Sequence, residues 1–180
     1  ATPAAMAQVT GPLSCTVLSV PLNGAGSSTG PGFTYLWVAS NGGNIFSGAN
    51  TLSPVVNAPG TYTLHVRNTQ NGCVSMVTVQ QIESVDYPVA DAGDDIILNC
   101  TPPNALLDGS GSSQGSNFMY HWTATDGGVL LNGANTMQPL AGHGGTYILQ
   151  VMNSLNGCAS TDSVVIVENN FAPVASVALP

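Results

Sequence analysis

Apolar and polar residues alternate along several short stretches of this chain. The stretches "FTYLWVA" (33–39) and "FMYHWTA" (118–124) place apolar side chains at every second position, and this period of two predicts β-strands. Apolar runs also cover 60–66 and 74–82, and again 145–151 and 159–167. Segments rich in Gly, Ser, Thr and Asn separate the runs. This pattern is typical of an all-β protein with many turns.

The pattern is written twice. Cys15 and Cys100, Trp37 and Trp122, and Tyr62 and Tyr147 each lie 85 residues apart. The stretch "GTYTLHVRNTQNGC" (60–73) returns as "GTYILQVMNSLNGC" (145–158). An 85-residue unit is too long for a solenoid turn and fits a small β-sandwich. We therefore expect two domains, 1–85 and 86–170, with the boundary near Ser84–Tyr87.

Substitutions between the two copies fall on one face of each predicted strand. In 33–39 the residues shared with the second copy are Phe33, Tyr35, Trp37 and Ala39, whereas the residues between them change. Because strand side chains alternate between faces, the shared face is predicted to be the core and the changed face to contact water. Asn71-Gly72 and Asn156-Gly157 predict a turn before the last strand of each copy.

Six aromatic residues are predicted to form the cores. Trp37 and Trp122 are predicted to pack in the cores, and the alternative is that they are platforms on which sugars stack. Tyr62 and Tyr147 enter a strand after Gly-Thr, as in a tyrosine corner. The predicted core aromatics are Trp37, Trp122, Tyr35, Tyr120, Tyr62 and Tyr147.

Two cysteines occur in each repeat. The simplest expectation is one disulfide per domain, Cys15–Cys73 and Cys100–Cys158, although two other pairings are open. Such bonds suit an exported protein. A zinc site is a poorer explanation, because each pair lacks a further Cys or His at ligand spacing.

The second repeat resembles the PKD-like and Ig-like repeats of bacterial cell-surface proteins. The residues that carry the resemblance are "ADAGDD" (90–95), "DGSGSS" (108–113), the Trp122 strand before "TDGG", and the closing "GTYILQVMNSLNGC". The first repeat has "NGAGSS" (23–28) and Trp37 before "SNGG". The resemblance implies tandem Ig-like or PKD-like β-sandwiches. It leaves the function open, because such modules serve in stalks, adhesins, gliding-adhesin arrays and accessory domains of secreted enzymes.

Charge excludes several partners. The 180 residues include one basic residue, Arg67, and nine acidic residues, all between Glu83 and Glu168. With no cationic groups to displace counterions, nucleic acid and anionic membrane surfaces are not expected partners. No run of about 18 apolar residues is present, so no membrane insertion is expected.

Three groups of residues are candidates for chemistry. Asp86, Asp91, Asp94 and Asp95 are either a solvated acidic linker or a calcium site between the repeats. Ser163, in Asp162-Ser163-Val164, matches an O-glycosylation signal of some surface-protein secretors. The three histidines, His65, His121 and His143, have no histidine at the equivalent position of the other repeat, and no nucleophile-elbow motif is present. We therefore expect neither an enzyme active site nor a resident cofactor, apart from the candidate calcium.

The last ten residues, 171–180, repeat the lead-in of the second module. Pro173, Val174 and Ala175 lie 85 residues after Pro88, Val89 and Ala90. The tail either leads into a further module or docks onto another copy by strand addition. We therefore expect a structural repeat of an extracellular bacterial adhesin, stalk or filament, with copies of itself or adjacent repeats as partners. The alternatives are a carbohydrate- or protein-binding module, with Leu36, Met119 and His121 as candidate contacts for a surface glycan or protein, and an accessory segment of a secreted enzyme.

Overall fold

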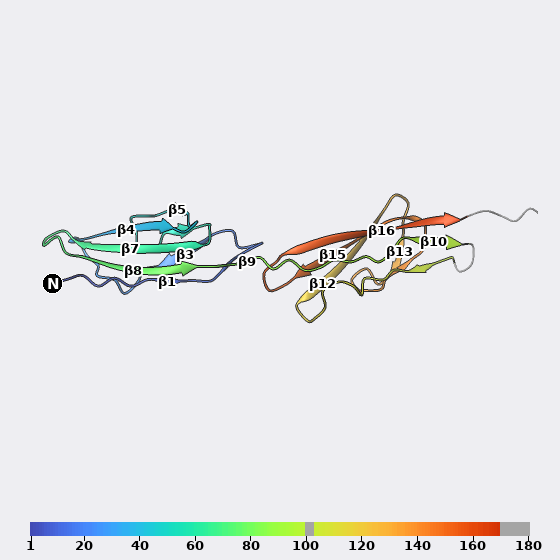
Figure 1. Cartoon of the computed structure of the whole chain (residues 1–180), viewed down its shortest axis with the longest axis horizontal. Coiled ribbons are helices and arrows are strands. Elements are labelled where there is room, and N and C mark those ends of the chain that lie inside the picture. Colours follow the sequence, from blue (N-terminus) through green and yellow to red (C-terminus); the bar gives the residue numbers. More distant parts are fainter. Residues whose placement is uncertain (100–102, 170–180) are drawn as a thin grey trace, which may run out of the picture. The chain divides into compact units, whose positions relative to one another are not determined.

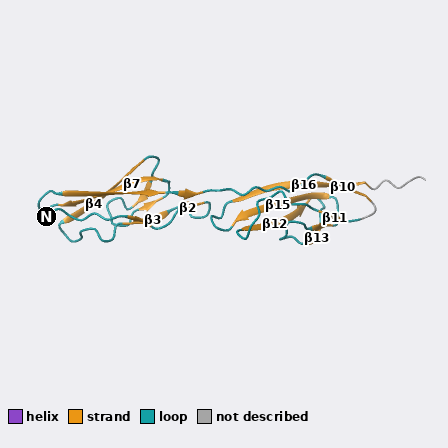
Figure 2. Ribbon diagram, turned by 60° about the horizontal axis from the view of Figure 1, so that its bottom comes forward, coloured by secondary structure: helices purple, strands orange, loops and turns teal. Residues whose placement is uncertain are grey.

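The computed structural model describes residues 1–99 and 103–169. The chain divides into two units, Ala1–Asp86 and Tyr87–Pro180, and the described residues form strands, turns and loops only (Figure 2). Cys100 and the tail residues Pro173, Val174 and Ala175 lie outside the described residues. The fold class expected from the sequence, all-β with two tandem Ig-like sandwiches, is confirmed.

Unit 1 contains two main sheets and a short strand pair. One sheet has the order β4-β7-β8 (Figure 1). The other has the order β1-β3-β6-β5, and β2 pairs with β9 in parallel. The strands are β1 (Gln8–Val9), β2 (Leu13–Ser14), β3 (Val20–Asn23), β4 (Phe33–Ser40), β5 (Ile45–Ser47), β6 (Val55–Val56), β7 (Gly60–Asn68), β8 (Val74–Gln81) and β9 (Glu83–Ser84).

Unit 2 repeats this plan with a longer last strand. Its sheets have the orders β10-β16-β15-β12 and β11-β14-β13, and β10 pairs with β16 in parallel. The strands are β10 (Ile96–Asn99), β11 (Ala105–Leu106), β12 (Phe118–Thr125), β13 (Leu130–Asn132), β14 (Leu140–Ala141), β15 (Gly145–Asn153) and β16 (Ala159–Asn169).

The two cores consist of equivalent residues. All eight residues of the buried cluster in unit 1 have their counterpart, 85 positions later, in the buried cluster of unit 2. The unit 1 residues come from both main sheets and from β2, so the core fills the space between the layers. They are Leu13, Val20, Leu22, Trp37, Val56, Tyr62, Leu64 and Val66.

The predicted core aromatics differ in depth. Trp37, Trp122, Tyr62 and Tyr147 are all at most 2% exposed, whereas Tyr35 and Tyr120 are partly buried at the edge of the clusters. Trp37 Nε1 donates to the Thr51 carbonyl at 3.0 Å, and Trp122 Nε1 repeats the bond to Thr136 at 3.0 Å. Both indoles are therefore core residues with a satisfied donor, and neither is a sugar platform.

The tyrosine corner predicted from Gly-Thr-Tyr is present. Tyr62 Oη donates to the Ala58 carbonyl, four residues upstream, at 2.7 Å, and accepts the Asn44 N–H at 2.8 Å. Tyr147 makes the equivalent bonds to His143 and Val129. Burial raises the pKa of the Tyr62 phenol above its ordinary value of 10.0, and the hydrogen bond with the Asn44 backbone opposes this.

Replacing Tyr62 with phenylalanine tests this corner. At neutral pH we expect a loss of about 1–3 kcal/mol in unfolding free energy, because a buried N–H and a carbonyl lose their partner. The raised pKa of Tyr62 makes this stabilisation depend on pH. The stabilisation is complete below the pKa that the phenol has in the unfolded chain, and it is lost as the pH rises through the pKa in the folded protein. Urea titrations between pH 7 and 11 should show this alkaline loss in the wild type and a smaller one in Tyr62→Phe. An equal loss of stability at alkaline pH in both proteins would contradict the role of the Tyr62 hydroxyl. Tyr87→Phe, at an exposed position, is the control.

Gln81 is a polar residue in an apolar position. It is 2% exposed, its Nε2 donates to the carbonyls of Gly11 (2.7 Å) and Ile82 (3.0 Å), and its Oε1 has no partner. The equivalent residue in unit 2 is Ile166, also 2% exposed and part of the core.

We expect Gln81→Ile to stabilise unit 1 by roughly 1 kcal/mol, because it removes an unpaired buried acceptor and adds apolar burial. Chemical denaturation measures the change, with Gln80→Ile at the neighbouring exposed position as the control. A loss of stability would show instead that the two amide hydrogen bonds outweigh the orphaned oxygen.

Candidate functional site

The pairing expected for the cysteines is wrong in unit 1. Cys73 is free and exposed, whereas Cys15 and Cys158 are disulfide-bonded. Cys15 follows β2, which pairs with β9 beyond the end of β8, whereas Cys73 precedes the start of β8. Eleven residues of extended chain, about 35 Å, separate these two ends, and a disulfide needs Cα atoms within about 7 Å.

In unit 2 the described residues on either side of this comparison are Asn99 and Cys158. Asn99, the last described residue before Cys100, pairs with Asn169 at the end of β16, whereas Cys158 precedes the start of that strand. The bond expected between Cys100 and Cys158 itself lies partly outside the described residues.

The four candidate calcium ligands all lie within the described residues. The described part of the chain holds no group of three or more His, Cys, Asp or Glu side chains placed for a metal ion. Asp91 Oδ1 accepts the Gly93 N–H at 2.9 Å, and Asp95 Oδ1 accepts the Val165 N–H at 2.8 Å. Asp86 and Asp94 are exposed. Two of the four carboxylates therefore bind the backbone of unit 2, and the calcium site between the repeats stays a prediction.

The lead-in of each unit docks onto a pair of serines. In unit 1, Ala4 N donates to Ser28 Oγ (2.8 Å), Ser28 N returns a bond to the Ala4 carbonyl (3.0 Å), and Met6 N donates to Ser27 Oγ (3.0 Å). In unit 2 the bonds recur between Val89 and Ser113 and between Asp91 and Ser112 (2.8–3.0 Å). The serines are those that end "NGAGSS" and "DGSGSS". Their recurrence in both repeats was the available signal for this docking, but its role was not recognised from the sequence.

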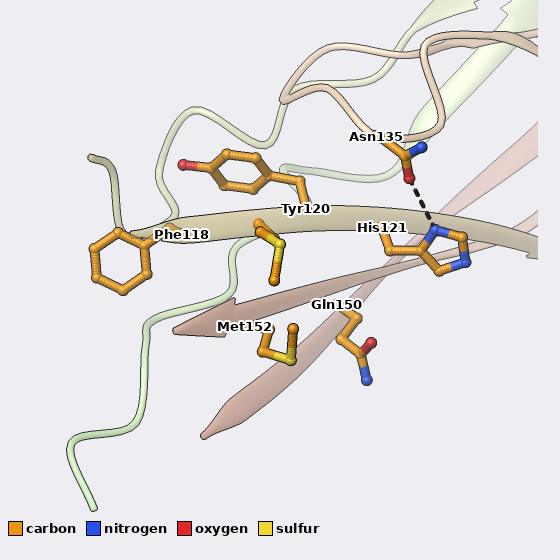
Figure 3. Close-up of a pocket in the computed structure, with 7 residues that line it drawn as sticks. Phe118, Tyr120, His121, Asn135, Gln150 and Met152 are labelled. Atoms are coloured by element: carbon orange, nitrogen blue, oxygen red, sulfur yellow. Dashed lines mark hydrogen bonds between the residues drawn. The ribbon is translucent and has the colours of Figure 1, made fainter. Parts of the chain in front are cut away.

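A groove of about 420 Å³ lies on the outward face of β12 and β15 in unit 2 (Figure 3). Met119 pairs with Met152 across the two strands, and His121 with Gln150. His121 Nδ1 lies 3.0 Å from Asn135 Oδ1. Since an amide oxygen only accepts, Nδ1 is the donor in this contact, and in the neutral imidazole Nε2 is then an acceptor. The groove is lined by Phe118, Met119, Tyr120, His121, Asn135, Gln150 and Met152.

Unit 1 has a groove at the same place with different side chains. It measures about 250 Å³ and is lined by Thr34, Tyr35, Leu36, His65, Arg67 and Val74. The tyrosine is common to both grooves, and the residues that differ are those on the outward strand face. Sequence reasoning selected Leu36, Met119 and His121 but missed Gln150, Met152 and Asn135, although strand alternation and register place the first two beside Met119 and His121.

The remaining candidates have no common site. Ser163 is exposed on β16, and Asp162 before it accepts the Ala92 N–H at 2.7 Å. His143 Nδ1 lies 3.5 Å from Glu168 Oε1, and its side chain is 64% exposed. No described segment forms a helix with the length and hydropathy that crossing a membrane requires.

Comparison with known proteins gives fold-level similarity only. No family model matches the chain, and no curated protein matches it. Among solved structures, the three N-terminal domains of the bacteriophage RB49 highly immunogenic outer capsid protein are similar, with 13% identity and a TM-score of 0.47, over 93% of this chain and 59% of that one.

Two further structures contain several extracellular or Ig domains. Drosophila OTK extracellular domains 3–5 share 14% identity at a TM-score of 0.43, over 94% of this chain and 60% of that chain. The eight N-terminal Ig domains of Down syndrome cell adhesion molecule share 12% identity at a TM-score of 0.38, over 92% of this chain and 25% of that chain. This chain therefore spans at most 60% of the length of these three structures. The class defined by its own sheets, core tryptophans and tyrosine corners is a tandem Ig-like repeat protein.

Proposed function

We propose that this chain is a structural repeat module of an extracellular bacterial adhesin, stalk or filament. The observation that carries the proposal is the contrast between the two units: eight equivalent core residues and the same serine-docked lead-in, beneath outward faces that differ. Selection for a fixed scaffold with a variable surface is expected of modules that add length and present side chains at intervals. The disulfide-bonded Cys15 and Cys158 support an oxidising, extracellular location.

The proposed role is neither catalytic nor dependent on a cofactor. The partners that we propose are adjacent repeats or other copies of this chain. Nucleic acid is not proposed, because Arg67 is the only side chain with a permanent positive charge.

The lead-in contacts support a proposal for assembly through the tail. Val174 and Ser176 occupy the sequence positions of Val89 and Asp91, whose backbone groups dock onto Ser113 and Ser112. We propose that the tail of one chain docks in this way onto the serine pair of another. The pair in unit 1 is already occupied by Ala4 and Met6, so docking there proceeds by exchange with the resident lead-in, as in strand addition.

Electron microscopy of three purified chains tests this proposal. The chains are residues 1–180, a version that ends at Asn170, and the full chain with Ser27→Val and Ser28→Val, which weakens the acceptor and keeps the tail. Filaments from the first chain only are the expected result. Short particles from all three would contradict self-assembly, and filaments from the truncated chain would contradict the role of the tail.

The groove of unit 2 favours a second function, the binding of a surface glycan or protein. Its open Nε2 acceptor, two amides and two methionines form a mixed polar and apolar surface that the smaller groove of unit 1 lacks. Glycan-array screening of the wild type beside His121→Ala tests it, with Leu36→Ala as the matched variant in unit 1. Signals that survive His121→Ala would place binding elsewhere.

A further inference from the structure

Two methionines and a histidine share the outward face of β12 and β15. Met119 lies directly opposite Met152 in the register of the two strands, and His121 follows Met119 two positions later on β12. Side chains directly opposite each other have Cβ atoms about 4.5–5.5 Å apart, and diagonal neighbours such as His121 and Met152 are about 7–8 Å apart. Because methionine is long and flexible, both thioethers and the imidazole are within reach of one ion in the groove that they line (Figure 3).

The imidazole of His121 is held in the form that binds a metal. Figure 3 shows the contact of its Nδ1 with Asn135 Oδ1 at 3.0 Å, in which Nδ1 donates, so Nε2 of the neutral ring carries the open lone pair. A metal-binding histidine typically donates its other ring N–H to an oxygen in this way, which fixes the tautomer and orients the ring. Asn135 comes from the loop between β13 and β14. The contact is therefore a second observation, separate from the strand register, that indicates a metal ligand.

The donor atoms decide which metal fits. The groove is lined by thioethers, an imidazole, amides and aromatic rings, and none of its described lining residues is a carboxylate or a thiol. Thioether sulfur favours Cu(I), whereas Ca²⁺ and Mg²⁺ take oxygen ligands and structural zinc sites use thiolates and imidazoles. Uncharged ligands also suit a monovalent ion, because a single charge is removed from water at a lower cost than a double one.

The charge of unit 2 favours the approach of a cation. This unit contains seven of the nine acidic residues of the chain and no Lys or Arg. The resulting negative potential raises the local concentration of cations.

Unit 1 has the same strands but different donors. At the equivalent positions its smaller groove has Thr34, Leu36 and Arg67. The guanidinium of Arg67 occupies the position of the Met152 sulfur and repels a cation. The thioether and imidazole set is therefore a feature of the surface of the second repeat and is not required by the fold.

We propose that the groove of unit 2 is a Cu(I) site, with Met119 Sδ, Met152 Sδ and His121 Nε2 as ligands. Asn135 is a positioning residue, because it acts through the imidazole. The site goes beyond the structural role proposed above and does not depend on it. It is also separable from glycan or protein binding at the same groove, because replacing methionine with leucine keeps an apolar surface and removes the ligand.

Competition with the chromophoric Cu(I) chelator bicinchoninate tests the site. The full chain is first treated with N-ethylmaleimide, so that free thiols do not compete, and ascorbate keeps the copper as Cu(I). We expect one Cu(I) per chain, and at least tenfold weaker binding in Met119→Leu, Met152→Leu and His121→Ala. Asn135→Ala should weaken binding roughly tenfold. Leu36→Ala, at the unit 1 position equivalent to His121, is the matched control and should bind as the wild type does.

Methyl NMR of the same chain, labelled with ¹³C-methyl methionine, identifies the ligands directly. The probe is Ag⁺, which prefers the same soft ligands and undergoes no redox change. The methyl signals of Met119 and Met152 should shift, whereas those of Met6, Met76 and Met137 should stay in place. Unshifted signals of these three residues also check that each variant is folded.

Three results would overturn the proposal. The first is an unchanged Cu(I) affinity in either leucine variant. The second is an equal shift of all five methionine signals, which would show adventitious binding to thioethers only. The third is Zn²⁺ binding at this groove as tightly as Cu(I), which would contradict the selection by soft ligands. None of these results would affect the filament assembly, which electron microscopy tests separately.

Discussion

Replacing Trp37 with alanine should lower the unfolding free energy of unit 1 by about 3–5 kcal/mol, the usual cost of removing a large aromatic from a core. The indole is 2% exposed, and its loss also leaves the Thr51 carbonyl without the 3.0 Å bond from Nε1. Because a small domain is stable by only about 5–15 kcal/mol, this single change removes a large share of the stability of the unit.

The chain contains one tryptophan per unit, which lets one experiment report both units. In Trp37→Ala the remaining fluorescence comes from Trp122, so urea titration followed by fluorescence monitors unit 2 and circular dichroism monitors both. We expect circular dichroism to show a transition of unit 1 at a lower urea concentration than in the wild type. The midpoint of the Trp122 fluorescence transition, which reports unit 2, should be unchanged. An equal shift of the Trp122 transition would show that the two cores do not unfold separately. Val38→Ala, at a 45% exposed position next to Trp37, should cost less than about 0.5 kcal/mol.

Replacing Gly60 with alanine should destabilise unit 1 by about 3 kcal/mol or more. A Cβ atom at this position would lie 2.3 Å from the Gly43 nitrogen and 2.5 Å from its Cα, and both are backbone atoms that cannot rotate away. The residue also has φ +156°. Gly145 in unit 2 repeats the close approach against Gly128, so Gly145→Ala should have the same effect on unit 2.

Two other glycines separate the steric cost from the conformational cost. Gly72 has φ +72°, but an added Cβ atom would meet nothing within 4 Å. Gly72→Ala should therefore lower the unfolding free energy by only about 1 kcal/mol. Gly11 has neither restriction, and Gly11→Ala should lie within about 0.5 kcal/mol of the wild type. Chemical denaturation of the three variants gives the order. Equal losses in Gly60→Ala and Gly72→Ala would contradict the close approach of the two backbones.

The candidate grooves could be predicted from the sequence only in part. Strand alternation indicated that Leu36, Met119 and His121 face outward, and they do. The register of β12 against β15 places Gln150 beside His121 and Met152 beside Met119. A loop brings Asn135 to His121. Register can be estimated from a repeated pattern, but the approach of a loop to a sheet depends on packing that no periodicity encodes.

The sequence by itself determined the repeat, the strands and the core. An 85-residue period with one shared strand face is sufficient, because burial selects the same side chains in both copies while exposed positions vary freely. Only the tertiary structure decided which cysteines can meet. Cys15 and Cys73 stand near the beginning and the end of their module in sequence, which suggested a bond. The last strand runs the full length of the sheet, however, and separates them by about 35 Å. Proximity in a sandwich depends on the direction of each strand, and strand direction is a property of the assembled sheets.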